Sequence, residues 1–270
     1  LDEPPPVETS HPGSRSTSYV VHGDAVSAAT LDAPKKVDHW YQIAGIDVTA
    51  TPQAAAVVTL GDSITDGRGS TTNGNDRWPD VLARRLQATP ATKTISVLNH
   101  GIGGNRILLD GLGPNALARF DRDVLVQTGT RYLIVLEGIN DLGTLARDGS
   151  TTAEQHTVLV NRIIGAYEQM ILRAHAHGIR VMGATILPFA GSGYSHSDGA
   201  AEADRQAINQ WIRDPKHFDA VADFDKAARD PQHPDHLIAA FDSGDHLHPS
   251  PAGYKAMADA VPLSLFSSAR

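Results

Sequence analysis

The chain has 270 residues, of which 41% are hydrophobic and 20% are charged, and this composition is typical of a globular protein with one α/β domain and an extension. The formal net charge of −8 gives no reason to expect a nucleic acid partner, and no apolar stretch approaches the roughly 18 residues of a membrane span. There are no cysteines, which excludes disulfides, thiolate zinc sites and a cysteine nucleophile.

The first 53 residues are expected to form an N-terminal extension. Residues 1–18 are rich in Pro, Ser, Glu and Thr, a composition that favours an extended or mobile tail. Short strands are predicted at residues 19–21 and 40–43, where β-branched and aromatic residues gather. We therefore expect residues 1–53 to be mobile at first and then to pack on a main domain, which spans residues 54–270.

From residue 54 onward the sequence alternates between strand and helix patterns. Strands are predicted at five apolar segments, namely residues 54–60, 95–98, 132–136, 179–187 and 220–224. Helices are predicted between and after them, at residues 77–87, 115–126 in part, 152–177, 200–212 and 251–260. Strands that alternate with helices form a parallel sheet. We expect an α/β fold, a three-layer α/β/α sandwich around a parallel, flavodoxin-like sheet of five strands.

The residues that could carry chemistry lie in four polar blocks. Ser63 follows the first strand within Gly-Asp-Ser-Ile-Thr, and Asp245 and His248 lie three residues apart near the C-terminus. Residues 99–105 and 138–141 follow the second and third strands. Because ligand sites in parallel sheets lie beyond the carboxyl ends of the strands, we expect the four blocks to meet there.

The residue types in these blocks suit nucleophilic hydrolysis. A serine hydroxyl such as that of Ser63 is a weak nucleophile until a base takes its proton, and a histidine base needs a carboxylate that fixes its tautomer. One turn of chain can bring the Asp245 carboxylate to the His248 ring. A glycine backbone N–H and an asparagine side-chain amide, both of which occur in the blocks at residues 99–105 and 138–141, are suitable hydrogen-bond donors for an oxyanion.

The four blocks also resemble the motifs of a known family. They read Gly-Asp-Ser-Ile-Thr, Asn-x-x-Ile-x-Gly, Gly-x-Asn-Asp and Asp-x-x-His, and in this order they resemble the SGNH (GDSL-type) hydrolase family over about residues 55–265. The resemblance implies that Ser63 is the nucleophile, that His248 is the base and that Asp245 is the partner of His248.

The same resemblance implies an oxyanion hole formed by Ser63, Gly104 and Asn140, and it implies neither a cofactor nor a metal. Ile64 stands where the family name has Leu, a position whose side chain should only pack. Similar enzymes are often exported, so a secreted or periplasmic protein is expected, although the chain begins with Leu1 and shows no signal peptide.

Several residues of the blocks have simpler interpretations. Ser63 could only cap a helix, and the Gly-x-Ser-x-Gly elbow of α/β-hydrolases is absent around it. The glycines before Asn105, Gly104 among them, could serve a tight turn, and they lack the Gly-x-Gly-x-x-Gly spacing of a dinucleotide site. Asn140 and Asp141 could cap the next segment, and capping or loop bracing is the better interpretation for Asp141.

Thirteen histidines raise the question of a metal site. Close pairs are His246 with His248 and His233 with His236, but a zinc site needs three or four convergent ligands. Surface or loop positions are the simpler interpretation for all of the histidines but His248. Asp242 is a rival for Asp245 as its partner, but its spacing is too long for the Asp-x-x-His pattern.

The sequence predicts a serine esterase that hydrolyses short-chain carboxylic esters through an acyl-enzyme, with a small-molecule or glycan ester, such as an acetylated sugar, as substrate. Residues 66–76 and 190–199, expected at the rim, offer little apolar wall for a long acyl chain. A longer-chain lipase or thioesterase is the alternative, because a groove could be lined by Leu108, Leu109, Leu112 and Phe189. A non-catalytic carbohydrate-binding module on the same fold is a further alternative, and the oligomeric state stays open.

Overall fold

A parallel sheet of five strands lies at the centre of the computed structural model, which describes residues 9–145, 151–194 and 199–267. The order across the sheet is β6 (Ile95–Gly101), β5 (Ala55–Gly61), β7 (Thr130–Leu136), β8 (Arg180–Ala184) and β9 (Ala220–Ala222). Every neighbouring pair is parallel. In chain order this is the 2-1-3-4-5 arrangement of flavodoxin-like sheets, so the predicted sheet is confirmed.

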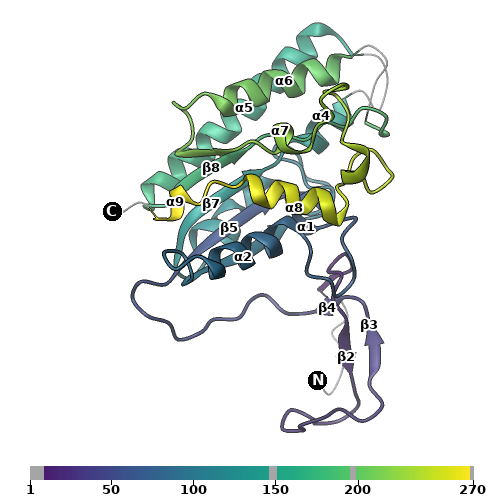
Figure 1. Cartoon of the computed structure of the whole chain (residues 1–270), viewed down its shortest axis with the longest axis vertical. Coiled ribbons are helices and arrows are strands. Elements are labelled where there is room, and N and C mark those ends of the chain that lie inside the picture. The colour runs from purple at the N-terminus through teal and green to yellow at the C-terminus, as the bar shows by residue number, and fades with distance from the viewer. Residues whose placement is uncertain (1–8, 146–150, 195–198, 268–270) are drawn as a thin grey trace.

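Helices cover both faces of the sheet (Figure 1). The helices α2 (Trp78–Ala88) and α8 (Pro251–Ala260) pack together on one face, and α5 (Ala153–Ala176) and α6 (Ala200–Arg213) pack together on the other. Shorter helical segments complete the layers: α1 (Ser63–Asp66), α3 (Ala116–Phe120), a π-turn (Asp121–Leu125), α4 (Ile139–Leu145), α7 (Phe224–Ala228), a 3₁₀ turn (Ala239–Phe241) and α9 (Ser264–Ser267). The predicted three-layer sandwich is confirmed.

Local sequence signals explain why the long elements form where they do. All seven residues of β5 are buried, as expected for a strand with parallel neighbours on both sides and helices on both faces. A capping box starts α5, since the Thr152 hydroxyl accepts from the Gln155 N–H and the Gln155 side chain accepts from the Thr152 N–H. The buried side chains of α5 then recur at helical spacing, at Ile163, Ala166, Tyr167, Met170 and Ala174.

Strand ends differ from the prediction at the carboxyl edge of the sheet. The strand β6 continues to Gly101, because residues 99–101 pair with the last residues of β5. The strand β8 ends at Ala184, because its neighbour β9 ends at Ala222 and Asp223 then caps α7. The sequence does not predict α4, whose Asn, Asp and Gly residues have low helix propensity. Tertiary packing therefore decides the structure where the chain turns around the site.

Two antiparallel ribbons precede the main domain. The strand β1 (Ser10–His11) pairs with β4 (Trp40–Tyr41), and β2 (Ser18–Val20) pairs with β3 (Lys35–Val37). The second ribbon projects from the body of the molecule (Figure 1). Among the described residues, no helix is long and apolar enough to cross a membrane.

The second half of the predicted tail lies against the main domain, whereas residues 1–8 fall outside the described residues. The Thr17 N–H donates to Asn73 Oδ1 at 2.8 Å, and the Asn73 N–H donates to the Arg15 carbonyl oxygen at 2.9 Å. The Arg77 guanidinium donates to the Ser14 carbonyl oxygen. The composition of this segment favours mobility, and its partners lie about 60 residues away in the chain, where no local pattern reveals them.

Candidate active site

The end of β5 places Ser63 at the carboxyl edge of the sheet. The strand ends at Gly61, and α1 begins with Ser63 itself. The N-cap of this helix is Asp62, whose carboxylate accepts from the Ile64 N–H at 2.8 Å. A capping role therefore belongs to Asp62, and the Ser63 hydroxyl is left for another partner.

That partner is the His248 ring. Ser63 Oγ lies 2.8 Å from His248 Nε2, and His248 Nδ1 lies 2.7 Å from Asp245 Oδ2. The tautomer that fits both contacts carries its proton on Nδ1, donates it to Asp245 and leaves Nε2 to accept from the serine. The other carboxylate oxygen of Asp245 accepts from the backbone N–H groups of Leu247 and His248 at 3.1 and 2.8 Å, so the loop folds back onto its own aspartate.

The electrostatic environment keeps the His248 ring neutral and Asp245 charged. Burial lowers the pKa of His248 below its ordinary value, and the Asp245 carboxylate, which acts in the opposite direction, offsets this only in part. Partial burial tends to raise the pKa of Asp245, but hydrogen bonds from the His248 N–H and ring outweigh burial and lower that pKa to about 2. A neutral imidazole against an ionised carboxylate is the state that a general base requires.

The expected oxyanion donors line the same pocket as Ser63 and His248. We call this cavity of about 600 Å³ the serine pocket. Gly104 adopts a φ of +71°, which glycine tolerates best. Within the described part of the chain, the backbone N–H groups of Ser63 and Gly104 have no acceptor. The Asn140 Nδ2 donates to the Asn105 carbonyl oxygen at 2.8 Å, which leaves its second hydrogen available.

A model of the GDSL-like lipase/acylhydrolase family matches residues 59–256. The chain belongs to this family. As a member of the acylhydrolases it is a hydrolase that acts on esters. The family match covers α1, which carries Ser63, and the loop that carries Asp245 and His248.

Solved structures agree with this placement. An acetylxylan esterase from Geobacillus stearothermophilus is 21% identical, with a TM-score of 0.57 over 81% of this chain and 98% of its own. A GDSL-like lipase from Bacteroides thetaiotaomicron VPI-5482 is 18% identical, with a TM-score of 0.55 over 79% of this chain and 88% of its own. At these identities the similarity establishes the fold. No curated protein is significantly similar to the chain in sequence.

Residues of the GDSL-type motifs other than the predicted catalytic ones brace the site. The Asn99 amide donates to the Thr65 carbonyl oxygen at 2.8 Å, which ties the end of β6 to α1. The Asp141 carboxylate accepts from the N–H groups of Ile107 and Leu108 at 2.8 and 3.1 Å. Asp141 therefore braces the chain at residues 107 and 108, and Asn99 braces α1 in a similar way.

A buried arginine that the sequence does not single out ties three strand ends together beneath the site. Arg119 donates to the Gly61 carbonyl oxygen of β5 at 3.0 Å and to the His100 carbonyl oxygen of β6 at 2.8 Å. It also contacts Glu137, which follows β7, at 3.4 Å. Arg119 also pairs with Asp123 at 3.0 Å. Partial burial tends to raise the pKa of Asp123, but hydrogen bonds from Arg122 and Arg119 outweigh burial and lower that pKa. Burial raises the pKa of Asp62 to about 7 and holds the pKa of Glu137 well above its usual range.

The N-terminal extension supplies a wall of the serine pocket. His11 Nε2 lies 2.7 Å from Asp66 Oδ1, at the end of α1, and the His11 ring meets Trp40 edge-on. Pro12, Gly13 and Arg15 line the same pocket as Ser63. These residues lie before the family match, and sequence reasoning missed them because their composition resembles that of a tail.

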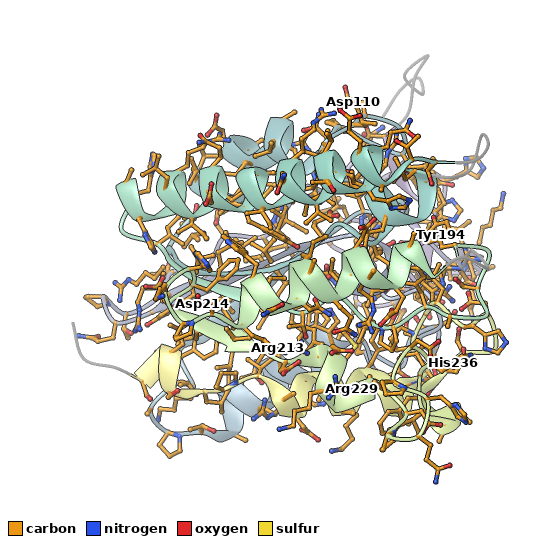
Figure 2. The ribbon with its side chains drawn as sticks, turned by 90° about the horizontal axis from the view of Figure 1, so that it is seen from above. Asp110, Tyr194, Arg213, Asp214, Arg229 and His236 are labelled. Atoms are coloured by element: carbon orange, nitrogen blue, oxygen red, sulfur yellow. The ribbon has the colours of Figure 1, made fainter. Side chains whose placement is uncertain are left out.

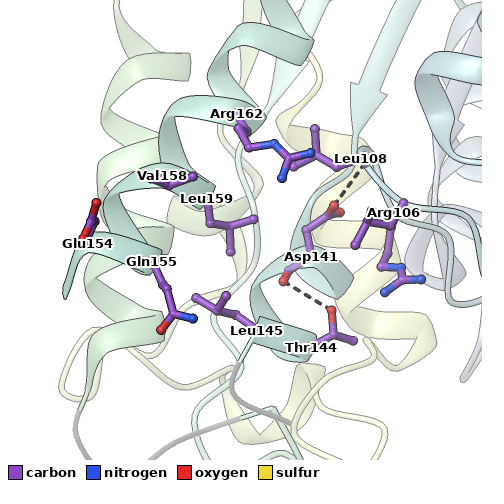
Figure 3. Close-up of a pocket in the computed structure, with 11 residues that line it drawn as sticks. Arg106, Leu108, Asp141, Thr144, Leu145, Glu154, Gln155, Val158, Leu159 and Arg162 are labelled. Carbon is purple, nitrogen blue, oxygen red and sulfur yellow. Dashed lines mark hydrogen bonds between the residues drawn. The ribbon is translucent and has the colours of Figure 1, made fainter. Parts of the chain in front are cut away.

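A second hollow is lined by residues of α4 and α5 (Figure 3). We call this cavity of about 550 Å³ the leucine pocket. Its apolar wall consists of Leu108, Leu109, Leu145, Val158 and Leu159, and its polar lining includes Arg106, Asp141 and Arg162. A smaller hollow lined by Arg106, Leu112, Asn140 and Thr144 lies between the two pockets.

The four apolar residues that could have lined one acyl groove lie in three different places. Leu108 and Leu109 line the leucine pocket, and Leu112 lies over Gly104 in the serine pocket. Phe189 is buried in the core. Of the four, Leu112 alone lines the pocket that contains Ser63.

The histidine pairs do not gather into a metal site. His246 Nδ1 contacts Asp242 Oδ2 at 2.6 Å on the outer side of the loop. The His233 and His236 rings lie edge to face at 6.0 Å between centroids. In residues 9–145, 151–194 and 199–267, no three His, Asp or Glu side chains are grouped so that they could hold an ion.

Proposed function

We propose that the protein is a serine esterase in which Ser63 is the nucleophile, His248 the general base and Asp245 the residue that orients it. The observation that carries the proposal is a pair of contacts: Ser63 Oγ lies 2.8 Å from His248 Nε2, and His248 Nδ1 lies 2.7 Å from Asp245 Oδ2. The lowered pKa of the buried His248 ring supports it, because the ring is neutral and ready to accept a proton near pH 7.

In the proposed reaction, Ser63 Oγ attacks the ester carbonyl carbon while its proton passes to His248 Nε2. The carbonyl oxygen becomes an oxyanion, which the N–H groups of Ser63 and Gly104 and the Asn140 amide stabilise. The tetrahedral intermediate collapses, and the alcohol leaves with the proton from His248. Water, deprotonated by the same ring, then attacks the acyl-enzyme and releases the acid and free Ser63.

A short acyl group, acetyl to butyryl, is the substrate we favour, with an acetylated sugar as a natural target. The serine pocket supports this, because polar and small residues make up much of its lining, including Ser10, His11, Gly103 and Gly113. The presence of an acetylxylan esterase among the structural neighbours agrees with an acetylated glycan. The same proposal includes export of the protein, because acetylated glycans are met outside the cytoplasm.

The direct test of the nucleophile is labelling with a fluorophosphonate. The wild-type protein should react at Ser63, and Ser63→Ala should neither react nor hydrolyse p-nitrophenyl acetate. Ser70→Ala is a control, since the Ser70 hydroxyl donates to the nearby Gly67 carbonyl oxygen and Ser70 does not line the serine pocket. Activity of Ser63→Ala near that of the wild type would refute the assignment, and an unreactive wild type would favour a non-catalytic binding module.

The leucine pocket favours a second candidate function, hydrolysis of longer acyl esters. Each methylene buried there would stabilise a bound chain by roughly 0.8 kcal/mol. We would measure kcat/KM for p-nitrophenyl acetate, butyrate, octanoate and palmitate in the wild type and in Val158→Ser. Leu172→Ser, which changes an exposed leucine elsewhere on α5, is the control. A maximum at octanoate that only Val158→Ser abolishes would establish the second function and displace the first.

A further inference from the structure

Tyr194 reaches the site from the turn that follows β8. Figure 2 shows it toward the same end of the molecule as Asp110, with Asp214 toward the other end. Its hydroxyl lies 2.8 Å from Asn140 Oδ1, and its ring lines the serine pocket. The ring rests on α4 at Gly143, where a Cβ would overlap it. Gly143 therefore leaves room for the Tyr194 ring against α4, the helix that also carries Asn140.

The directions of the hydrogen bonds around Asn140 follow from its neighbours. The Asn105 carbonyl oxygen can only accept, so the terminal atom of Asn140 that lies 2.8 Å from it is Nδ2. The other terminal atom is then Oδ1, which can only accept, so the Tyr194 hydroxyl is the donor. One hydrogen of Nδ2 is used by Asn105, and the second is left for the serine pocket.

We propose that Tyr194 is a positioning residue that holds the Asn140 amide with its second N–H directed at the oxyanion. This inference rests on the proposed function. The torsion that turns an asparagine amide is broad and has no sharp preferred value, so the side chain needs an anchor at each end. Asn105 anchors Nδ2 and Tyr194 anchors Oδ1. A donor at the amide oxygen also strengthens the amide N–H as a donor in turn.

A merely structural Tyr194 would act through its ring alone. Tyr194→Phe separates the two roles, because it keeps the ring against Gly143 and removes only the hydroxyl. We expect kcat for p-nitrophenyl acetate to fall about three- to tenfold, with KM changed less than about twofold, because the oxyanion exists only in the transition state. The melting temperature should stay close to that of the wild type.

Tyr132→Phe is the matched control. It removes a hydroxyl that donates to the Phe266 carbonyl oxygen at 3.3 Å, on a residue near the start of β7 and outside the serine pocket. Its kcat should equal that of the wild type.

A double-mutant cycle identifies the route of the effect. Asn140→Ala alone should lower kcat by about 10²–10³. In that background Tyr194→Phe should change kcat by less than about 1.5-fold, because the partner of the hydroxyl is gone. This outcome, together with the single-mutant result, would support the proposal.

Three outcomes would overturn it, and they differ in what else they affect. If Asn140→Ala is impaired but Tyr194→Phe matches the wild type, Tyr194 has no positioning role and the proposed function stands. If Tyr194→Phe lowers kcat equally with and without Asn140, or changes mainly KM, it acts by another route. If Asn140→Ala leaves kcat unchanged, this inference and the oxyanion role of Asn140 both fail.

Discussion

Two aspartate–histidine pairs share the loop at residues 242–248. Asp242 contacts His246 at 2.6 Å and Asp245 contacts His248 at 2.7 Å. The two contacts are nearly the same length, but only the second histidine reaches a serine hydroxyl. At the scale of the residue, therefore, placement against Ser63 distinguishes a candidate base from a histidine that merely braces its loop.

This difference predicts the ranking of two substitutions. Asp245→Asn should favour the wrong imidazole tautomer and lower kcat by up to about 10⁴. Asp242→Asn keeps an oxygen that can accept from the loop N–H groups and should cost less than about tenfold. Steady-state kinetics with p-nitrophenyl acetate measures both, and a larger loss in Asp242→Asn would show that the pairing is assigned to the wrong aspartate.

The lowered pKa of His248 predicts the acid limb of the pH profile. The base must be neutral, so activity falls as pH drops through the pKa of the ring. Burial places that pKa below the ordinary value of 6.5, and kcat/KM should stay on its plateau from about pH 7 to 8. In Asp245→Asn the residual activity should titrate at still lower pH, because the carboxylate that raises the pKa is gone. A wild-type limb centred above pH 7 would contradict the assignment.

At the scale of the element, the carboxyl ends of three strands depend on one side chain. Arg119 comes from α3, yet it bonds the last residue of β5 and the end of β6, and it meets Glu137 beyond β7. The Arg119 side chain has no exposed surface. The position of Ser63 relative to the proposed oxyanion donors should therefore depend on a residue that does not line the serine pocket.

Arg119→Met should reveal this dependence. Removing one partner of a buried ion pair leaves the others uncompensated, so the free energy of unfolding should fall by roughly 3–5 kcal/mol at pH 8. The loss should be smaller at pH 5.5, because Asp62, whose pKa burial raises to about 7 and whose charged form Arg119 stabilises, binds a proton between the two pH values. Urea denaturation at the two pH values measures both effects.

Arg122→Met is the control for this experiment. Arg122 also pairs with Asp123, but its side chain is 63% exposed, so its loss should cost less than about 1 kcal/mol. Equal losses in the two variants would mean that the buried network does not hold the strand ends.

Whether the sequence predicts a site residue depends on how far away its partners lie in the chain. Ser63, Gly104 and Asn140 each follow a strand of one parallel sheet, so topology alone brings them to a common edge. Asp245 and His248 meet within a single short loop. Arg119 and Tyr194 have no such signal, since their partners Gly61 and Asn140 lie 58 and 54 residues away. A lone arginine or tyrosine in a helix or turn pattern has many possible partners, and only the folded chain selects one.

At the scale of the whole molecule, the N-terminal extension takes part in the site. The His11–Asp66 contact fixes one end of the segment that lines the serine pocket, and backbone bonds at Arg15 and Thr17 fix the other. The family match begins at residue 59, whereas the lining of the serine pocket begins at Ser10.

His11→Ala should loosen this wall. We expect kcat/KM for 1-naphthyl acetate, which has a bulky alcohol, to rise at least roughly threefold relative to p-nitrophenyl acetate, with little change in melting temperature. His22→Ala, which changes an exposed residue between β2 and β3, is the control and should leave the ratio unchanged. An unchanged ratio in His11→Ala would show that the wall does not limit the substrate.

The wall at residues 10–15 also has a consequence for how such enzymes diversify. The proposed nucleophile and its partners are encoded after residue 59, while part of the surface that meets the substrate is encoded before it. Recombination between relatives at a point near residue 54 would exchange that surface and leave the chemistry intact. Chimeras joined there, with residues 9–54 taken from different donors, would form a family of enzymes with one reaction and several substrate preferences.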